Sequence, residues 1–274
     1  MATLAVDARQ AKVATQTGDQ IARLVALVFA TIVLLLVVIL VFQLWVGSAE
    51  SRHKLGWGFL TSSAWNPVTE ELGALPFIYG TVITSFVALL ISIPLGVGAA
   101  IFLSELAPAM MSNTLTFLVE LLAAFPSVIY GLLAFLSLVP IMRSYVEPFL
   151  KRDFGFLPFF TGPAFGVGYL TASLVLAIMT LPFIISVSRE SLLAVPREQR
   201  EAALALGATK WETTWQIVVP YAKLGIYGSI FLGLARALGE TMAVTMVIGN
   251  APQIRASLLA PGYSIASVIA NEFA

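Results

Sequence analysis

Long apolar runs alternate with shorter polar segments along the chain. A helix needs about 20 apolar residues to cross the hydrocarbon core of a bilayer. Five stretches qualify: residues 21–46, 77–103, 114–142, 165–187 and 222–248. Prolines and glycines inside them are compatible with spans, because neighbouring helices provide partners for the freed backbone groups. The pattern predicts an all-α, polytopic bundle of transmembrane helices with five visible spans.

The polar segments divide this chain further. Residues 1–20 are polar and of mixed charge, and the apolar run behind them is too long for a signal peptide. We therefore expect a cytoplasmic tail at 1–20, a retained first transmembrane helix at 21–46, and one membrane domain over 77–274. Residues 143–163 are predicted to be a loop, and the mildly apolar stretch 249–274, interrupted by Pro and Gly, is not predicted to be a sixth span.

Composition narrows the class of protein. Of the 274 residues 59% are hydrophobic and 11% are charged, whereas a soluble domain carries roughly a quarter charged residues. Fifteen basic residues balance fifteen acidic ones, so no basic excess points to nucleic acid. With no Cys and only His53, thiol chemistry and most transition-metal sites are disfavoured. We expect a protein that is not an enzyme, with no cofactor and no metal, and the chain has no Walker A sequence of its own.

The loop between the fourth and fifth spans has the features of two helices joined at a corner. Pro196 is suited to the start of the first helix, and Gly207 is suited to the left-handed residue that ends it. Thr209 and Glu212 have the spacing of a capping box for the second helix, which Pro220 is expected to close before the fifth span. An apolar stripe is predicted along the second helix at Trp211, Trp215, Val218 and Val219. By these features alone, an ordinary helical loop is as good an interpretation as a docking site.

The same loop resembles the EAA loop of type I ABC importer permeases, the MetI-like kind. The matching residues are Glu201, Ala202 and Ala203, then Gly207 after three residues, Ile217 after nine, and Pro220 at the end; Val219 replaces the usual Leu. The resemblance implies that residues 196–220 form a coupling loop that docks on an ATPase subunit at the cytoplasmic side. It thereby implies a cytoplasmic N-terminus.

The fifth predicted span carries two charges. Gly225, Ser229 and Gly233 form a stripe of small residues that lets another helix approach closely, and Arg236 and Glu240 continue near that face. Counting from residue 222 places Arg236 close to the middle of the bilayer, where a lone charge is costly. Either the two charges neutralise each other and pin the bundle, or they line a path for an anion, since a guanidinium can donate two parallel bonds to phosphate.

Two segments resemble the PstC family of phosphate permease subunits: residues 236–250, RALGETMAVTMVIGN, and residues 125–131, FPSVIYG. The likeness extends over about 76–274. It implies a translocation path that includes Arg236, Glu240 and Thr241. It also implies a bacterial inner-membrane complex with a PstA-like second permease, a PstB-like ATPase dimer and a periplasmic PstS-like binding protein, together importing inorganic phosphate. Members of that family continue with a further helix, so we expect a permease domain that is incomplete at its C-terminus and lacks a sixth span.

Other functions fit the sequence less well. A related ABC importer for another anion would share the coupling loop. A secondary transporter or channel does not need that loop and often shows inverted repeats, which are not detected here. An intramembrane enzyme is disfavoured because the sequence has no His/Cys cluster and no pair of carboxylates on one span.

Overall fold

The computed structural model describes residues 2–69 and 71–272, with side chains described from residue 18 onward. The chain divides into two units, Met1–Gly58 and Phe59–Ala274. Each unit is described by itself.

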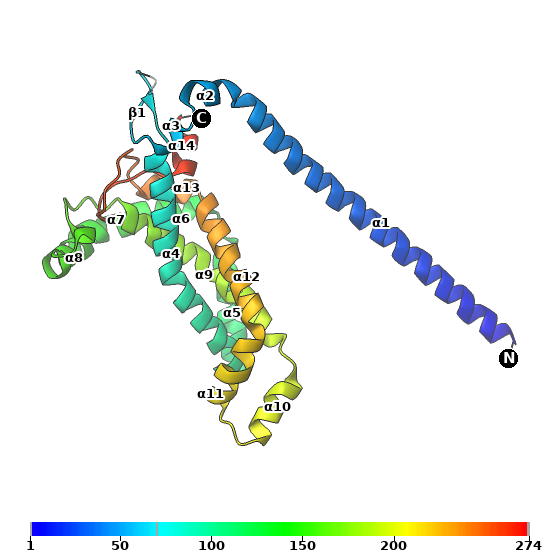
Figure 1. The fold of residues 1–274 in the computed structure, drawn as a ribbon. Helices are drawn as coiled ribbons and strands as arrows, with labels where there is room; N and C mark the ends of the chain where they lie inside the picture. The colour runs from blue at the N-terminus through cyan, green and yellow to red at the C-terminus, as the bar shows by residue number, and fades with distance from the viewer. Residues whose placement is uncertain (1, 70, 273–274) are drawn as a thin grey trace. The chain divides into compact units, whose positions relative to one another are not determined.

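The first unit is dominated by one long helix, α1 (Ala2–Gly47), followed by α2 (Ala49–Leu55) (Figure 1). Residues 18–47 are long and apolar enough to cross a membrane, which confirms the first predicted span. At the end of α1, Arg52 folds back over Trp45. Its guanidinium carbon lies 3.5 Å from the ring centroid, and Nη2 donates to the Trp45 carbonyl oxygen at 2.6 Å. This cation–π contact and hydrogen bond fix the turn into α2.

The second unit is a helical bundle with one small β-ribbon. Its α-helices and strands, in chain order, are α3 (Gly58–Thr61), β1 (Trp65–Asn66), β2 (Glu71–Leu72), α4 (Leu75–Ile101), α5 (Ala109–Ala124), α6 (Ser127–Leu133), α7 (Val139–Ile141), α8 (Glu147–Phe154), α9 (Tyr169–Leu193), α10 (Arg197–Ala205), α11 (Lys210–Thr213), α12 (Val219–Gly239), α13 (Met242–Val247) and α14 (Ile265–Glu272). Strands β1 and β2 pair antiparallel, with Trp65 opposite Leu72. The all-α prediction is confirmed.

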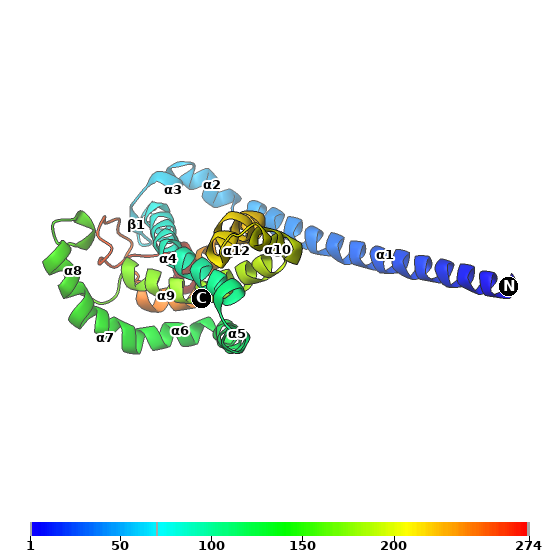
Figure 2. The same ribbon diagram turned by 90° about the horizontal axis from the view of Figure 1, so that it is seen from below.

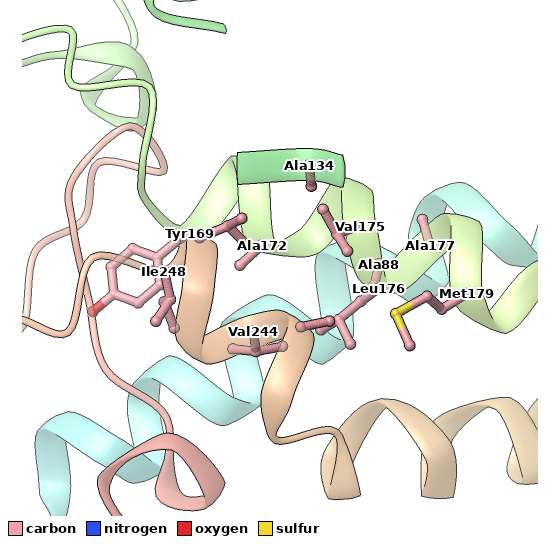
Figure 3. Close-up of a cluster of buried hydrophobic side chains, with 12 residues drawn as sticks. Ala88, Ala134, Tyr169, Ala172, Val175, Leu176, Ala177, Met179, Val244 and Ile248 are labelled. Carbon is pink, nitrogen blue, oxygen red and sulfur yellow. The ribbon is translucent and has the colours of Figure 1, made fainter. Parts of the chain in front are cut away.

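Helices α4, α9 and α12 lie side by side and form the centre of the bundle (Figure 1). Helices α5 to α8 form an arc along one side of it (Figure 2). A buried apolar cluster joins α9 to α13: Tyr169, Val175 and Leu176 lie against Val244 and Ile248 (Figure 3). Removing this surface from contact with water or lipid and packing it densely stabilises the centre of the bundle.

The small residues of α12 face α9, as predicted. The hydroxyl oxygens of Ser229 and Ser188 are 2.7 Å apart. A Cβ atom added at Gly225 would lie 2.1 Å from Ser191 Oγ, and one added at Gly233 would lie 3.1 Å from Ile184. The stripe therefore sets how closely α12 approaches α9.

Four helical segments widen into a π-helical turn: η1 (Phe102–Leu106), η2 (Ala134–Leu138), η3 (Met142–Val146) and η5 (Thr214–Val218). In each case a proline follows two residues after the turn: Pro108, Pro140, Pro148 and Pro220. A proline has no N–H, and its ring clashes with the carbonyl four residues earlier in an α-helix. Widening the preceding turn moves that carbonyl away. Three of the four helices therefore continue past the proline, and only the segment before Pro108 ends.

These turns and two helix breaks correct the predicted spans. The count of five is confirmed: Gly18–Gly47, Leu75–Leu106, Ser127–Phe154, Tyr169–Leu193 and Lys210–Gly239. The predicted third span, 114–142, is wrong in its bounds because the chain is extended at Phe125 and Pro126 and separates α5 from α6. The predicted loop at 143–163 is helical through Phe154. The fifth span starts earlier because Pro220 does not close the preceding helix. It ends at Gly239 because the chain is extended at Glu240. Among the described residues of the last stretch, α14 has eight residues and is too short to be a span.

Candidate functional site: the coupling loop and Arg236

Helix α10 and the corner after it stand at one end of the bundle, opposite α14 (Figure 1). Pro196, with φ −56° and ψ 141°, directly precedes α10. Gly207 adopts φ +87°, as expected for the residue that ends the helix. The Gly207 N–H donates to the Leu204 carbonyl at 3.0 Å, and the Ala208 N–H donates to the Ala203 carbonyl at 3.2 Å. This pair of bonds is a Schellman motif.

The Schellman motif explains the spacing between the alanine pair and the glycine. In such a motif the donor of the outer bond comes one residue after the left-handed residue, and its acceptor lies five residues before the donor. Here that acceptor is Ala203, the last alanine of the EAA sequence, and the left-handed residue is Gly207. No atom lies within 4 Å of a Cβ added at Gly207, so the positive φ, not crowding, requires glycine there.

The second helix begins with the predicted capping box. Thr209 Oγ1 accepts from the Glu212 N–H at 3.2 Å, and Glu212 Oε2 accepts from the Thr209 N–H at 2.7 Å. The predicted apolar stripe is wrong as a single face. Val218 is fully buried, whereas Trp211 and Trp215 are about half exposed. The π-helical turn η5 covers Thr214–Val218, so the regular α-helical spacing that would place all three on one face is not kept. The two indole rings meet edge to face at 5.5 Å and line an apolar groove of about 550 Å³ beside α4.

The predicted docking residues differ in exposure. Glu201, Ala202, Gly207 and Pro220 are exposed, Ile217 is half-buried, and Ala203 is buried under the corner. A partner could therefore contact Glu201 and Ala202 directly. Ala203 and Ile217 face the protein itself and support the shape of the loop.

Arg236 extends from α12 towards α9. Its guanidinium carbon is 4.7 Å from the ring centroid of Phe183 on α9. Phe183 is near the middle of α9, so Arg236 is level with the centre of that span although it is close to the end of its own helix. The Arg236 Nε atom is buried and has no hydrogen-bond partner among the described residues. A buried donor without a partner calls for an explanation, and a transiently bound ligand is one.

The alternative in which Arg236 and Glu240 neutralise each other as an i,i+4 helical pair does not agree with the structure. Helix α12 ends at Gly239, and Glu240 is extended with φ −73° and ψ 125°. No ion pair joins the two side chains in the part of the chain that the structure describes. Glu240 is buried, and its Oε1 accepts from the Ala243 N–H at 3.3 Å, so it caps the start of α13. Thr241, half-buried, occupies the N-cap position of that helix.

Comparison with known proteins identifies the family to which this chain belongs. Residues 82–264 match the family described as binding-protein-dependent transport system inner membrane component. The chain is 48% identical over 248 residues to the phosphate transport system permease protein PstC of Mesorhizobium japonicum, covering 89% of this chain and 76% of the relative. It is 49% identical over 249 residues to PstC of Pasteurella multocida, covering 89% and 78%. The chain belongs to the PstC family.

A more distant PstC relative is similar over nearly the same length. The probable phosphate transport system permease protein PstC of Methanocaldococcus jannaschii is 34% identical over 247 residues, covering 88% of this chain and 78% of the relative. With five helices able to span a membrane, this PstC-family chain is a multi-pass membrane protein. Its relatives are named permeases of transport systems, not enzymes. Among the described residues no group of three or more His, Cys, Asp or Glu side chains could hold a metal ion.

One residue of this site was missed by the sequence analysis. Arg200, just before Glu201, points back into the protein and forms an ion pair with Glu105. Nothing in the local sequence distinguishes Arg200 from the other basic residues between the fourth and fifth spans. Its partner is 95 positions away, so no local spacing could reveal the pair.

Proposed function

We propose that this chain is the permease subunit of an ATP-driven importer of inorganic phosphate. The bundle provides the translocation path, and residues 196–220 couple it to a nucleotide-hydrolysing partner. One observation carries the proposal: α10, which contains the EAA sequence, ends in a hydrogen-bonded, exposed corner at Gly207 and lies in the chain between α9 and α12, the two helices between which Arg236 lies. A movement of the corner would therefore reach the charge inside the bundle.

The contacts of Arg236 support a path for an anion. A guanidinium inside a membrane bundle is costly and is kept where it faces a bundle interior or a water-filled cavity. Among the residues that the structure describes, its buried Nε atom has no partner and no ion pair with Glu240 neutralises its charge. A planar guanidinium can donate two parallel hydrogen bonds to phosphate. We assign Arg236 the role of transient anion contact, with Glu240 and Thr241 shaping the break between α12 and α13.

The remaining assignments follow from the family. The relatives are named as permeases of phosphate transport systems. We infer a complex with a second, PstA-like permease, a PstB-like ATPase dimer and a PstS-like periplasmic phosphate-binding protein. The coupling loop then faces the cytoplasm of a bacterial inner membrane, and the N-terminus lies on the same side.

The docking assignment can be tested by reversing the charge of Glu201. Because Glu201 is exposed on α10, Glu201→Lys should leave the chain in the membrane but weaken co-purification of the ATPase subunit and reduce ATP-dependent phosphate uptake. Glu71→Lys is the matched control, since Glu71 is equally exposed but lies on the β-ribbon at the other end of the bundle. Undiminished ATPase binding and uptake in Glu201→Lys would refute the docking assignment.

The path assignment is tested separately with Arg236→Gln. This change removes the charge and keeps much of the side-chain length. Phosphate uptake should fall much more than the amount of protein in the membrane. Equal losses of uptake and abundance would show that Arg236 only stabilises the bundle. Sulfate can also be tested as a competitor of phosphate uptake by the wild-type complex. If it competes as strongly as unlabelled phosphate does, a permease for another anion is favoured.

A further inference from the structure

The side chain of Arg200 connects three segments of the bundle at its loop end. Its Nη2 atom lies 2.9 Å from Glu105 Oε1, and its Nε atom lies 3.2 Å from Glu105 Oε2. The guanidinium and the carboxylate therefore meet in a two-point fork, the geometry that adds specificity as well as strength. The two side chains are only 19% and 11% exposed, so water screens the pair weakly.

The same guanidinium also closes the end of α9. Nη2 donates to the Leu192 carbonyl at 2.7 Å, and Nη1 donates to the carbonyl of Val195. The last carbonyls of a helix have no partner within the helix, and a positive charge next to them is favourable. Arg200 therefore holds the end of α9 and the start of α10 in one fixed arrangement.

Glu105 belongs to a different helix. It lies in the π-helical turn η1, which continues α4 to the end of the second span at Leu106. Helix α4 lies against α9 over much of its length. Through Glu105 and Arg200, the short helix α10 is thus bound to the ends of two central helices, although its only covalent connection on that side is to α9.

We propose that Arg200 and Glu105 form the joint that transmits a displacement of α10 to α4 and α9. This inference rests on the proposed coupling function. Both are positioning residues, because the role assigned to them acts through the placement of α10 and not through the anion. Without the ion pair, α10 would turn about the connection at 194–196 while α4 stayed in place. ATP hydrolysis would then continue with less movement of the bundle.

The test compares two variants in the assembled importer, reconstituted with its ATPase, second permease and binding protein. Glu105→Gln removes the charge of the fork. Arg200→Lys keeps the charge but cannot reach the carboxylate and two carbonyls together. In both, phosphate uptake per ATP hydrolysed should fall by about tenfold, the factor lost with one charge-assisted hydrogen bond, while ATPase binding is retained. Arg152→Gln is the control, since its pair with Asp153 is exposed and joins adjacent residues.

A second measurement separates a joint from a simple stabilising contact. The chain has no cysteine, so spin labels can be placed at Gln199→Cys on α10 and Leu90→Cys on α4, both exposed. The distance distribution between them should broaden in Glu105→Gln and stay narrow in Arg152→Gln. An unchanged distribution together with an unchanged uptake-to-ATP ratio would overturn the joint. If instead wild-type uptake does not depend on ATP, the proposed function fails, whatever the variants show.

Discussion

The close contact of α12 with α9 leads to a quantitative prediction for Gly225→Ala. The added Cβ would lie 2.4 Å from Ser191 Cβ, whereas ordinary contacts begin at 3.4 Å. Ser191 Cβ is fixed to the backbone of α9, so no rotamer change relieves the overlap, and the two helices must separate by about 1 Å locally. Overpacking of this kind costs about 1–3 kcal/mol.

The matched control is Gly228→Ala, three residues further along the same helix. Nothing lies within 4 Å of a Cβ added there. Each substitution gains about 1 kcal/mol of helix propensity, so the difference between the variants isolates the overlap. At about 2–4 °C per kcal/mol for a chain of this size, a cost of about 1–3 kcal/mol means that Gly225→Ala should melt roughly 2–12 °C below Gly228→Ala.

The assay is thermal unfolding of the purified protein in detergent, combined with a second substitution on α9. Ser191→Gly removes the atom that is overlapped and should recover most of the loss in the double variant. Ser191→Ala retains Cβ and should recover little. Equal melting temperatures for Gly225→Ala and Gly228→Ala, or equal rescue by both Ser191 changes, would refute the proposed packing of the two helices.

Three further changes test other parts of the structure. Gly207→Ala should destabilise the corner by about 1 kcal/mol, because residue 207 has a positive φ that alanine disfavours. The loss should be seen as faster hydrogen exchange at the end of α10. Unchanged exchange would contradict the Schellman motif. Thr209→Ala removes the capping box and should cost about 1 kcal/mol, seen as faster exchange in α11 but not in α10. Gly80→Ala would place a Cβ 2.0 Å from the Tyr263 carbonyl oxygen, whereas Gly98→Ala on the same helix meets nothing within 4 Å. Gly80→Ala should lower the melting temperature and Gly98→Ala should not. A lower melting temperature in both variants would contradict the close contact at Gly80 as the cause.

The corner between α10 and α11 could be predicted from sequence because its causes are local. A left-handed glycine, a capping box and their spacing each depend on a few neighbouring residues, and the structure shows Gly207, Thr209 and Glu212 in the expected roles. The number of spans was also predictable, since it depends on apolar length alone. The family likeness, not the spacing, pointed to phosphate.

The behaviour of the prolines was not predictable from local rules. Pro220 was expected to end a helix, yet the π-helical turn before it lets the helix continue to Gly239. The sequence does not distinguish this outcome from a break such as that at Pro126, because the choice depends on packing against other helices. The break after Gly239, where no proline stands, was also not predicted. Without it, Glu240 would have stayed on the helix face of Arg236, as expected.

The bond pattern around Gly207 also limits how the loop can vary in length. The two carbonyl acceptors and the left-handed residue are tied by helix geometry, so a one-residue deletion or insertion between Ala203 and Gly207 would move glycine out of the only position where its backbone freedom is needed. Insertions after Glu212, beyond the cap, would leave those bonds untouched. The nine-residue spacing from Gly207 to Ile217 must therefore have a different cause, since it lies outside these bonds.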